Sequence, residues 1–187
     1  KDTALILYLI YIVMTVIETV MLLFGGMSFF ESLLHTFGTA GTGGFGFKRD
    51  SLASYSPYIQ WVITAFMILF GVNFNLYYLM LLKKFKAVVT STELWAYFGI
   101  ILSSAALIAW NIRHLFVGTE QTVRTAAFQV ASVISTTGYA TADFNLWPNF
   151  SKNILFILMF IGGCAGSTAG GIKVSRIVLL FKLISNE

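Results

Sequence analysis

The chain has 187 residues, of which 57% are hydrophobic and only 11% are charged, with a net charge of +4. Soluble domains carry about 25% charged residues, and a soluble core of this size cannot hide so much apolar surface, so the composition predicts an integral membrane protein. The positive charges form no dense basic run, which excludes a nucleic-acid-binding function and leaves no nucleic-acid partner to expect.

Apolar segments that can cross a bilayer follow one another along the chain. A bilayer core of about 30 Å needs about 20 helical residues. The first two segments reach that length, the third is marginal, and the last qualifies only if its two halves form one broken helix. These segments are residues 3–24, residues 59–82, residues 93–110, and residues 153–161 joined to residues 174–184.

Two shorter helical segments lie between these spans, and each ends in a glycine-rich loop. Residues 27–38 contain Ser28 and Glu31 at the spacing of a capping box. As a helix they rise about 18 Å, roughly half the membrane. Residues 118–136 repeat the pattern, with Thr119 as the expected N-cap. A half-length helix followed by flexible backbone predicts a re-entrant segment, whose irregular backbone must be buried in protein or line a wet cavity.

The order span, half-helix, glycine loop, span therefore occurs twice. Aligning Gly44 with Gly138, 94 residues later, also places Thr42 on Thr136. Repeats of this kind commonly form a binding site where they meet. The fold class we expect is an all-α integral membrane protein of two span–re-entrant pore loop–span repeats, with the last span broken by an intramembrane glycine-rich loop. The two repeats are residues 1–86 and 87–187.

The positive-inside rule orients these repeats. The link between them carries Lys83, Lys84 and Lys86 and no acidic residue, so we expect it to be cytoplasmic. Both half-helices and their glycine loops then enter from the outer side. Cationic residues near the end of the sequence agree with this orientation: Lys173, Arg176 and Lys182. Other cationic residues fall on the outer side and weaken it: Lys48, Arg49, Arg113 and Arg124.

The half-helices end where the glycine loops begin, and aligned peptide dipoles leave about half a negative charge at a helix C-terminus. Two such ends meeting on one axis favour a cation at mid-membrane, where the idealised desolvation cost is of order 20 kcal/mol. No carboxylate lies in either loop, so backbone carbonyl oxygens must replace the ion's water, as in a selectivity filter. The predicted filter residues, which hold a monovalent cation and no other metal, are Thr42, Gly43, Gly44, Phe45, Thr136, Thr137, Gly138 and Tyr139.

Three motifs resemble the Trk/Ktr/HKT superfamily of potassium transporters, and the likeness is greatest to TrkH-type subunits. They are GTGGFGFKRDS, TTGYATADFNLWP and, most specifically, FIGGCAGSTAGGIKVSRIVLLFK. The resemblance covers essentially the whole chain and implies four span–loop–span repeats around one pore, of which this chain matches the second and third. The chain also begins without methionine, so we expect a fragment of a longer subunit, or a pore that two copies complete.

The resemblance implies passive, selective permeation of K⁺, with Rb⁺ and less Na⁺. It also assigns a role to the glycine-rich break in the last span, which matches the intramembrane loop that gates the pore. Five glycines in ten positions cannot stay helical, which suits a movable plug. The expected gate is Gly162, Gly163, Cys164, Ala165, Gly166, Ser167, Thr168, Ala169, Gly170 and Gly171, with Lys173 just beyond it.

The partners expected from the resemblance are a second full-length subunit, forming a homodimer, and a cytosolic nucleotide-binding regulatory subunit of the TrkA type. Membrane lipid surrounds the spans, and the expected location is the cell's inner membrane. No catalytic constellation is present, so we expect no enzyme and no bound cofactor besides the permeating K⁺. Two other functions stay open: an ion-coupled secondary transporter (K⁺ with H⁺ or Na⁺) that uses the broken helix as its binding site, and a purely structural membrane subunit.

Several isolated polar side chains admit more than one role. Glu18, inside the first span, is a functional candidate by default, and the alternative is a structural pairing with Arg124 or with a half-helix end. His35 and His114 are expected at the outer interface or in local hydrogen bonds rather than as ligands. Asn73 and Asn75, within the second span, are expected to hydrogen-bond between helices. Cys164 is expected to be a small packing residue.

Overall fold

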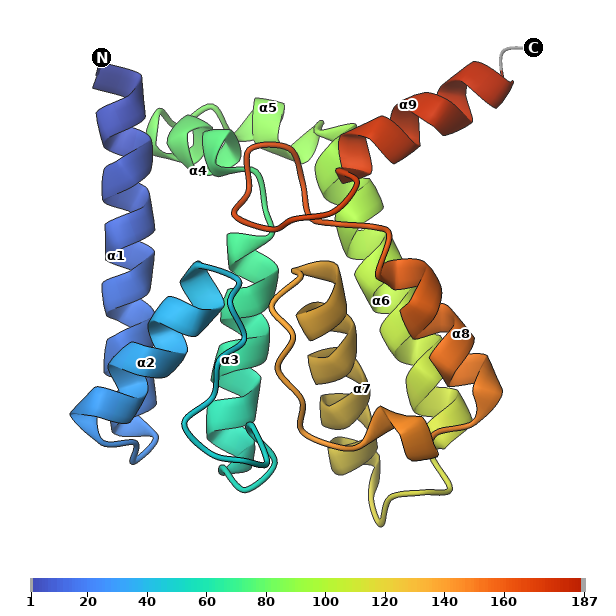
Figure 1. The fold of residues 1–187 in the computed structure, drawn as a ribbon. Helices are drawn as coiled ribbons and strands as arrows, with labels where there is room; N and C mark the ends of the chain where they lie inside the picture. Colours follow the sequence, from blue (N-terminus) through green and yellow to red (C-terminus); the bar gives the residue numbers. More distant parts are fainter. Residues whose placement is uncertain (1, 186–187) are drawn as a thin grey trace.

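The computed structural model describes residues 2–185, and every regular element in that range is helical. Figure 1 shows the helices arranged side by side, with a smaller layer of short helices across one end. The helices are α1 (Asp2–Phe24), α2 (Phe29–Ala40), α3 (Pro57–Phe70), α4 (Phe74–Leu81), α5 (Phe85–Val89), α6 (Thr92–Ile112), α7 (Thr119–Ile134), the 3₁₀-helix η1 (Phe144–Leu146), α8 (Asn149–Leu158) and α9 (Val174–Ser185).

Two of the described helices are long and apolar enough to cross a membrane by themselves: α1, over Thr3–Phe24, and α6. The bent pair α3 and α4 makes a third candidate if the two count as one span. The fourth predicted span is divided as expected, because the 10 residues of α8 and the 12 of α9 are separated by the glycine-rich segment. The apolar helices and their lengths make this a multi-pass membrane protein.

The prediction of one continuous helix over residues 59–82 is wrong. α3 ends at Phe70, α4 begins at Phe74, and the two axes differ by 88°. Gly71 leaves room at this break for the Tyr97 hydroxyl, since a Cβ on Gly71 would lie 2.1 Å from that oxygen. Asn73 caps α4 by accepting from the Asn75 backbone N–H at 2.9 Å. The expected interhelical hydrogen bond of Asn73 is therefore replaced by a local cap.

The half-length helices form close to where the sequence places them. α2 begins with the predicted capping box: the Ser28 hydroxyl accepts from the Glu31 N–H at 3.3 Å, and the Ser28 N–H donates to the Glu31 carboxylate at 3.1 Å. The hydrogen bonds from the Ser28 backbone and side chain lower the pKa of Glu31. α7 differs at its start, because Gly118 occupies the N-cap position without a side-chain hydrogen bond, so Thr119 is the first helical residue rather than the cap.

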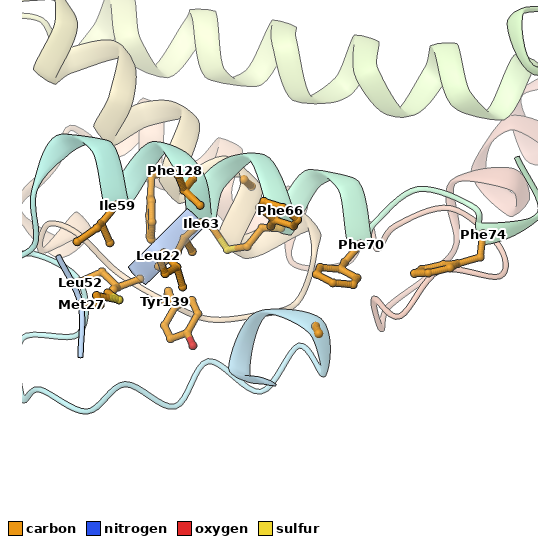
Figure 2. Close-up of a cluster of buried hydrophobic side chains, with 14 residues drawn as sticks. Leu22, Met27, Leu52, Ile59, Ile63, Phe66, Phe70, Phe74, Phe128 and Tyr139 are labelled. Carbon is orange, nitrogen blue, oxygen red and sulfur yellow. The ribbon is translucent and has the colours of Figure 1, made fainter. Parts of the chain in front are cut away.

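The core consists of two apolar clusters, one in each half of the chain, joined across α3 and α7. The first cluster is centred on α1, α2 and α3, yet it includes Phe128 and Ala131 of α7 and Tyr139 of the following loop. Figure 2 shows Tyr139 lying beside Leu22 and Ile63 in this cluster. The second cluster is built on α6, α7 and α8. Side chains of the second repeat thus complete the core of the first.

A polar junction on the loop side of α3 and α7 ties the halves together. The buried Gln60 amide donates to the Leu52 carbonyl at 2.9 Å and accepts from the Arg124 guanidinium. Arg124 also pairs with Glu120 at 2.9 Å, and Glu120 accepts from the Trp61 indole at 3.0 Å. The Arg124 guanidinium is thus bound by Gln60 of α3 and Glu120 of α7. The suggested pairing of Glu18 with Arg124 is therefore wrong.

Replacing Gln60 with leucine is expected to destabilise the protein by about 1–3 kcal/mol, because the Leu52 carbonyl and part of the Arg124 guanidinium would remain buried without a partner. Thermal unfolding of the detergent-solubilised protein measures the effect. Gln121→Leu is the matched control, since Gln121 lies in α7 and its side chain is exposed. Equal unfolding temperatures for the two variants would show that the junction contributes nothing.

Candidate functional site

The loops after α2 and α7 have the same backbone structure. We call residues 41–46 the first glycine loop and residues 135–140 the second. In the first, the N–H groups of Gly43 and Gly44 both donate to the Gly38 carbonyl, at 2.8 and 3.3 Å. In the second, the equivalent N–H groups donate to the Ser132 carbonyl, at 3.0 and 3.3 Å. The same offset of 94 residues that aligns the sequences therefore also aligns the hydrogen bonds.

Both loops turn through the left-handed region at matching positions. φ is +51° at Thr42 and +66° at Gly44, and it is +58° at Thr136 and +90° at Gly138. A β-branched residue with positive φ is a rare and strained conformation. Strain of this kind persists only where the surrounding structure imposes it, and it clusters at functional sites. The repetition at two equivalent threonines marks these loops as the candidate site.

The two loops touch each other at Gly44. A Cβ built on Gly44 would lie 1.9 Å from the Thr137 carbonyl oxygen, so no side chain fits there. On the other side, a Cβ on Gly138 would meet no described atom within 4 Å. Gly44 is thus required by close backbone approach, whereas Gly138 faces open space and is glycine because of its φ.

The carbonyl groups of these loops divide into two kinds. Those of Phe45 and Tyr139 are used, since the Tyr139 hydroxyl lies 3.5 Å from the first and the Ser132 hydroxyl donates to the second at 2.6 Å. Among residues 2–185, no hydrogen bond ends on the carbonyl oxygens of residues 42–44 or 136–138. These six oxygens occupy equivalent positions in the two loops and are available to a cation.

Tyr139 locks the second loop onto the first repeat. Its ring is fully buried, and its hydroxyl donates to the His35 carbonyl of α2 at 3.1 Å. A Cβ on Gly38 would lie 2.1 Å from that hydroxyl, so Gly38 supplies the notch that receives it. Phe45, the equivalent residue of the first loop, is 78% exposed. The aromatic residue of the first loop has no corresponding notch within the described part of the chain.

Acidic, cysteine and histidine side chains do not form the site. Across residues 2–185, no group of three or more such side chains could hold a metal ion. His114 is exposed, as predicted, but His35 is fully buried beneath Tyr139, so its predicted place at the outer interface is wrong. The rings of His35 and Tyr139 lie 5.6 Å apart. The sequence does not reveal this burial because the covering ring comes from a residue 104 positions later.

Residues 162–171, which we call the third glycine loop, connect α8 to α9. Figure 1 shows this loop, in red, above the ends of α3 and α7. Its two ends are joined at a neck, where the Gly162 N–H donates to the Ile172 carbonyl at 2.9 Å and the Ile172 N–H donates to the Phe160 carbonyl at 3.1 Å. A Cβ on Gly162 would lie 1.8 Å from the Gly170 carbonyl oxygen, so this neck closes only around glycine.

The third glycine loop is held at the break between α3 and α4. The Cys164 N–H donates to the Gly71 carbonyl at 2.9 Å, and the Thr168 hydroxyl donates to the Phe70 carbonyl at 3.2 Å. These are carbonyls that the end of α3 leaves without helical partners. In return, the Gly166 carbonyl accepts from the Phe74 N–H at 3.2 Å. Cys164 itself is fully buried, which agrees with the predicted packing role.

Three further contacts connect the third loop to charged and polar side chains. Glu93, in the first turn of α6, accepts from the Ala165 N–H at 2.6 Å. Thr136, in the second glycine loop, accepts from the Gly170 N–H at 2.7 Å. The Lys173 ammonium group donates to the Ala169 carbonyl within the loop. Sequence reasoning missed Glu93, since nothing in the order of residues links a helix start to a loop 72 positions later.

Comparison with known proteins places this architecture in a family. The model of the family "TrkH: Cation transport protein" matches residues 1–187. The Trk system potassium uptake protein TrkH of Escherichia coli K12 is 36% identical over 191 residues, covering 100% of this chain and 39% of that protein. TrkH of Halomonas elongata is 31% identical over 201 residues, and the match covers 97% of this chain and 38% of that protein.

A solved structure has the same fold. The crystal structure of the potassium transporter TrkH from Vibrio parahaemolyticus matches with a TM-score of 0.90 and 31% identity, over 96% of this chain and 40% of that one. The chain thus spans about two fifths of the length of the relatives it matches. The agreement holds across almost every residue of the chain, in sequence and in backbone alike. The chain belongs to the TrkH family of cation transport proteins.

Proposed function

We propose that these residues form the central part of a potassium uptake subunit and contribute two of the filter strands through which K⁺ permeates. The observation that carries the proposal is the pair of matched glycine loops, which touch at Gly44 and keep six carbonyl oxygens free of hydrogen bonds from the described residues 2–185. The names of the relatives, which are potassium uptake proteins, support K⁺ as the ion. Rb⁺ is expected to follow K⁺, with less Na⁺.

In the proposed mechanism, carbonyl oxygens replace the hydration shell of the ion. The two half-length helices α2 and α7 stop midway along the molecule (Figure 1), so their C-terminal ends face the interior. Each end carries about half a negative charge. Filter oxygens at fixed positions can then offset a desolvation cost that no carboxylate in the loops offsets. The filter consists of residues 42–45 and 136–139, with the carbonyls of residues 42–44 and 136–138 as the ligands.

The remaining filter strands are proposed to come from chain outside these residues. The buried Tyr139 packs in the Gly38 notch of the preceding repeat, whereas the equivalent Phe45 is exposed and lacks such a notch. A closed ring of repeats would supply one. Residues 1–86 and 87–187 are then two of four pore repeats, each with a re-entrant half-helix that enters from the outer side. The Lys83–Lys86 link faces the cytoplasm, and the membrane is the cell's inner membrane.

The third glycine loop is proposed as the gate. It is held by hydrogen bonds to the α3–α4 break, to Glu93 and to Thr136, and the last of these joins it directly to the second filter strand. A plug held by single hydrogen bonds, each contributing about 1 kcal/mol, can be displaced by a modest conformational change elsewhere. The gating residues are 162–171, with Lys173 holding the end of the loop.

Regulation is proposed to come from partners that act on this gate. The relatives are components of a system named Trk, which supports a second protein in the assembly. A homodimer of full-length subunits and a cytosolic nucleotide-binding subunit of the TrkA type are the partners we propose, within a shell of membrane lipid. The displacement of a plug needs no chemical reaction, so we propose no enzyme activity for these residues and no cofactor bound by them beyond the permeating ion.

An ion-coupled transporter is the second candidate, favoured by the buried Glu18 carboxyl within α1 and by the broken helix between α8 and α9. Coupled movement of H⁺ or Na⁺ would shift the reversal potential when the gradient of the second ion changes. Passive permeation would keep the reversal potential at the equilibrium potential of K⁺, whatever the gradient of the second ion. Measurements in proteoliposomes with opposed K⁺ and H⁺ gradients distinguish the two functions.

Gly44→Ala in the full-length subunit is expected to lower the K⁺/Na⁺ permeability ratio about tenfold or more, equivalent to about 1.4 kcal/mol. The new methyl group would push the Thr137 carbonyl out of the filter. The measurement is the reversal potential under bi-ionic conditions in proteoliposomes. Gly26→Ala is the matched control, because Gly26 also has positive φ, +90°, but a Cβ there meets nothing within 4 Å. An unchanged ratio in Gly44→Ala would contradict the filter.

Gly138→Ser tests the other filter strand, where strain rather than a clash is expected. The side chain would have to adopt a φ of +90°, and it would project into open space beside the free carbonyls. We expect weaker discrimination between K⁺ and Na⁺ with the protein still folded, recorded as flux of Rb⁺ competed by each ion. Selectivity equal to that of wild type would count against the second strand.

Removing the Glu93 carboxylate is expected to raise resting flux, because the Ala165 N–H would lose its acceptor and the closed loop would be less stable. With about 1–3 kcal/mol lost from the closed state, the open fraction rises about fivefold or more. Glu93→Ala is compared with Thr92→Ala, an exposed neighbour in the same helical turn. Deletion of residues 166–170 should raise flux further. An equal ⁸⁶Rb⁺ leak in Glu93→Ala, Thr92→Ala and the deletion variant would exclude the loop as the gate.

A further inference from the structure

An apolar groove lies between α1, α3 and α4. Its volume is about 510 Å³, and all the side chains that line it are hydrophobic or aromatic. Tyr77 contributes a hydroxyl group to this lining, and that hydroxyl already donates to the Leu69 carbonyl at 2.8 Å. The walls of the groove therefore suit a hydrocarbon chain rather than a polar ligand, because a pocket for a polar ligand carries groups that fix its orientation.

The helix α4 limits the groove at one end. Its axis departs from that of α3 by 88°, and Figure 1 shows it lying across the end of the bundle beside α1. The Tyr11 ring of α1 holds this corner together, with its centroid 5.8 Å from that of Phe70 and 6.2 Å from that of Phe74. A straight helix that followed α1 and α3 across a bilayer core of about 30 Å would meet α4. A flexible hydrocarbon chain bends around it.

Lysine side chains follow directly on the part of α4 that lines the groove. Met80 and Leu81 belong to the lining, and Lys83 and Lys84 come immediately after the helix. Both lysine side chains are exposed, as is that of Lys86, and within residues 2–185 none of the three forms an ion pair with an acidic group. Unpaired cations beside a membrane attract anionic lipid headgroups. The groove and the lysines thus match the two ends of one molecule.

The segment that carries these lysines has the character of a membrane–water interface. Large apolar side chains alternate with the lysines and are exposed in the structure, namely those of Leu82, Phe85 and Val89. The Trp95 indole is 63% exposed and donates to the Val89 carbonyl at 2.7 Å. Exposed tryptophan and lysine beside apolar side chains are typical of the headgroup level of a bilayer. The lysines therefore lie at the depth of lipid phosphate groups, and the groove lies at the depth of the acyl chains.

We propose that the groove between α1, α3 and α4 is a binding site for an anionic phospholipid: an acyl chain occupies the groove, and Lys83 and Lys84 bind the phosphate group. The groove accepts the chain of any phospholipid, and the lysines select for a negatively charged headgroup. This selectivity distinguishes the site from the general lipid shell around the spans. The proposal goes beyond the potassium transport proposed above and does not depend on the filter, because the site uses neither of the first two glycine loops.

The test measures the binding of dioleoylphosphatidylglycerol to the delipidated full-length subunit in detergent by native mass spectrometry, with dioleoylphosphatidylcholine as the neutral comparison. Wild type should bind the anionic lipid more tightly. The Lys83→Gln/Lys84→Gln variant should bind the anionic lipid about tenfold more weakly, since two cationic contacts are lost, and the neutral lipid as before. Arg176→Gln/Lys182→Gln is the matched control, because it removes two exposed cations from α9 at the same end of the molecule (Figure 1).

A second pair of variants tests the groove itself. Val13→Trp fills the groove and should weaken the binding of both lipids. Val20→Trp is its control, since Val20 lies two turns further along the same face of α1, outside the groove, and is 42% exposed against 47% for Val13.

Equal affinity of wild type for the two lipids would overturn the proposal, as would equal losses in the lysine variant and its α9 control. Lipid binding that Val13→Trp leaves unchanged would also overturn it. A lower unfolding temperature of that variant would then assign the groove to a helix from outside these residues.

Discussion

The structure depends on one constraint: backbone that leaves the helix inside a membrane must still find partners for its N–H and C=O groups. Three glycine loops follow helices in this chain, and many of their N–H groups donate to turn carbonyls, to side-chain oxygens or to neighbouring backbone. Among residues 2–185, the carbonyl oxygens of residues 42–44 and 136–138 accept no hydrogen bond. Unpaired oxygens of this kind are costly in an apolar medium and are the expected ligands of a dehydrated cation. The same constraint explains the third loop, because its N–H groups dock on carbonyls that the end of α3 leaves free.

Much of the local structure could be predicted because it depends on residues close together in sequence. The Ser28–Glu31 capping box, the half-length helices and the 94-residue repeat all follow from spacing and composition, and the structure contains each of them. The bend at residues 71–73 could not be predicted from an uncharged apolar run. It is stabilised by the Tyr97 hydroxyl and by the third loop, which lie far along the chain. The contact of Glu93 with the third loop and the burial of His35 could not be predicted for the same reason, because their partners are distant in sequence.

The two halves are related by pattern rather than by identity, and the differences carry information. Positive φ recurs at Thr42 and Thr136 although the neighbouring side chains differ. The receiving notch at Gly38, however, corresponds in the second half-helix to Ser132, whose hydroxyl bonds its own loop at the Tyr139 carbonyl. The two halves therefore support the same loop backbone with different contacts. If the loops form the proposed filter, one strand can be more easily deformed than the other.

The neck of the third glycine loop has a mechanical consequence. Gly162 and Ile172 are hydrogen-bonded across the base of the loop, so the segment between them is a closed lariat attached to α8 and α9 at a single point. A loop closed in this way can change its orientation about the neck while the neck hydrogen bonds stay intact and α8 and α9 keep their separation. Under the gate proposed above, a movement of α9 would reach the loop through this neck, because α9 begins directly beyond it.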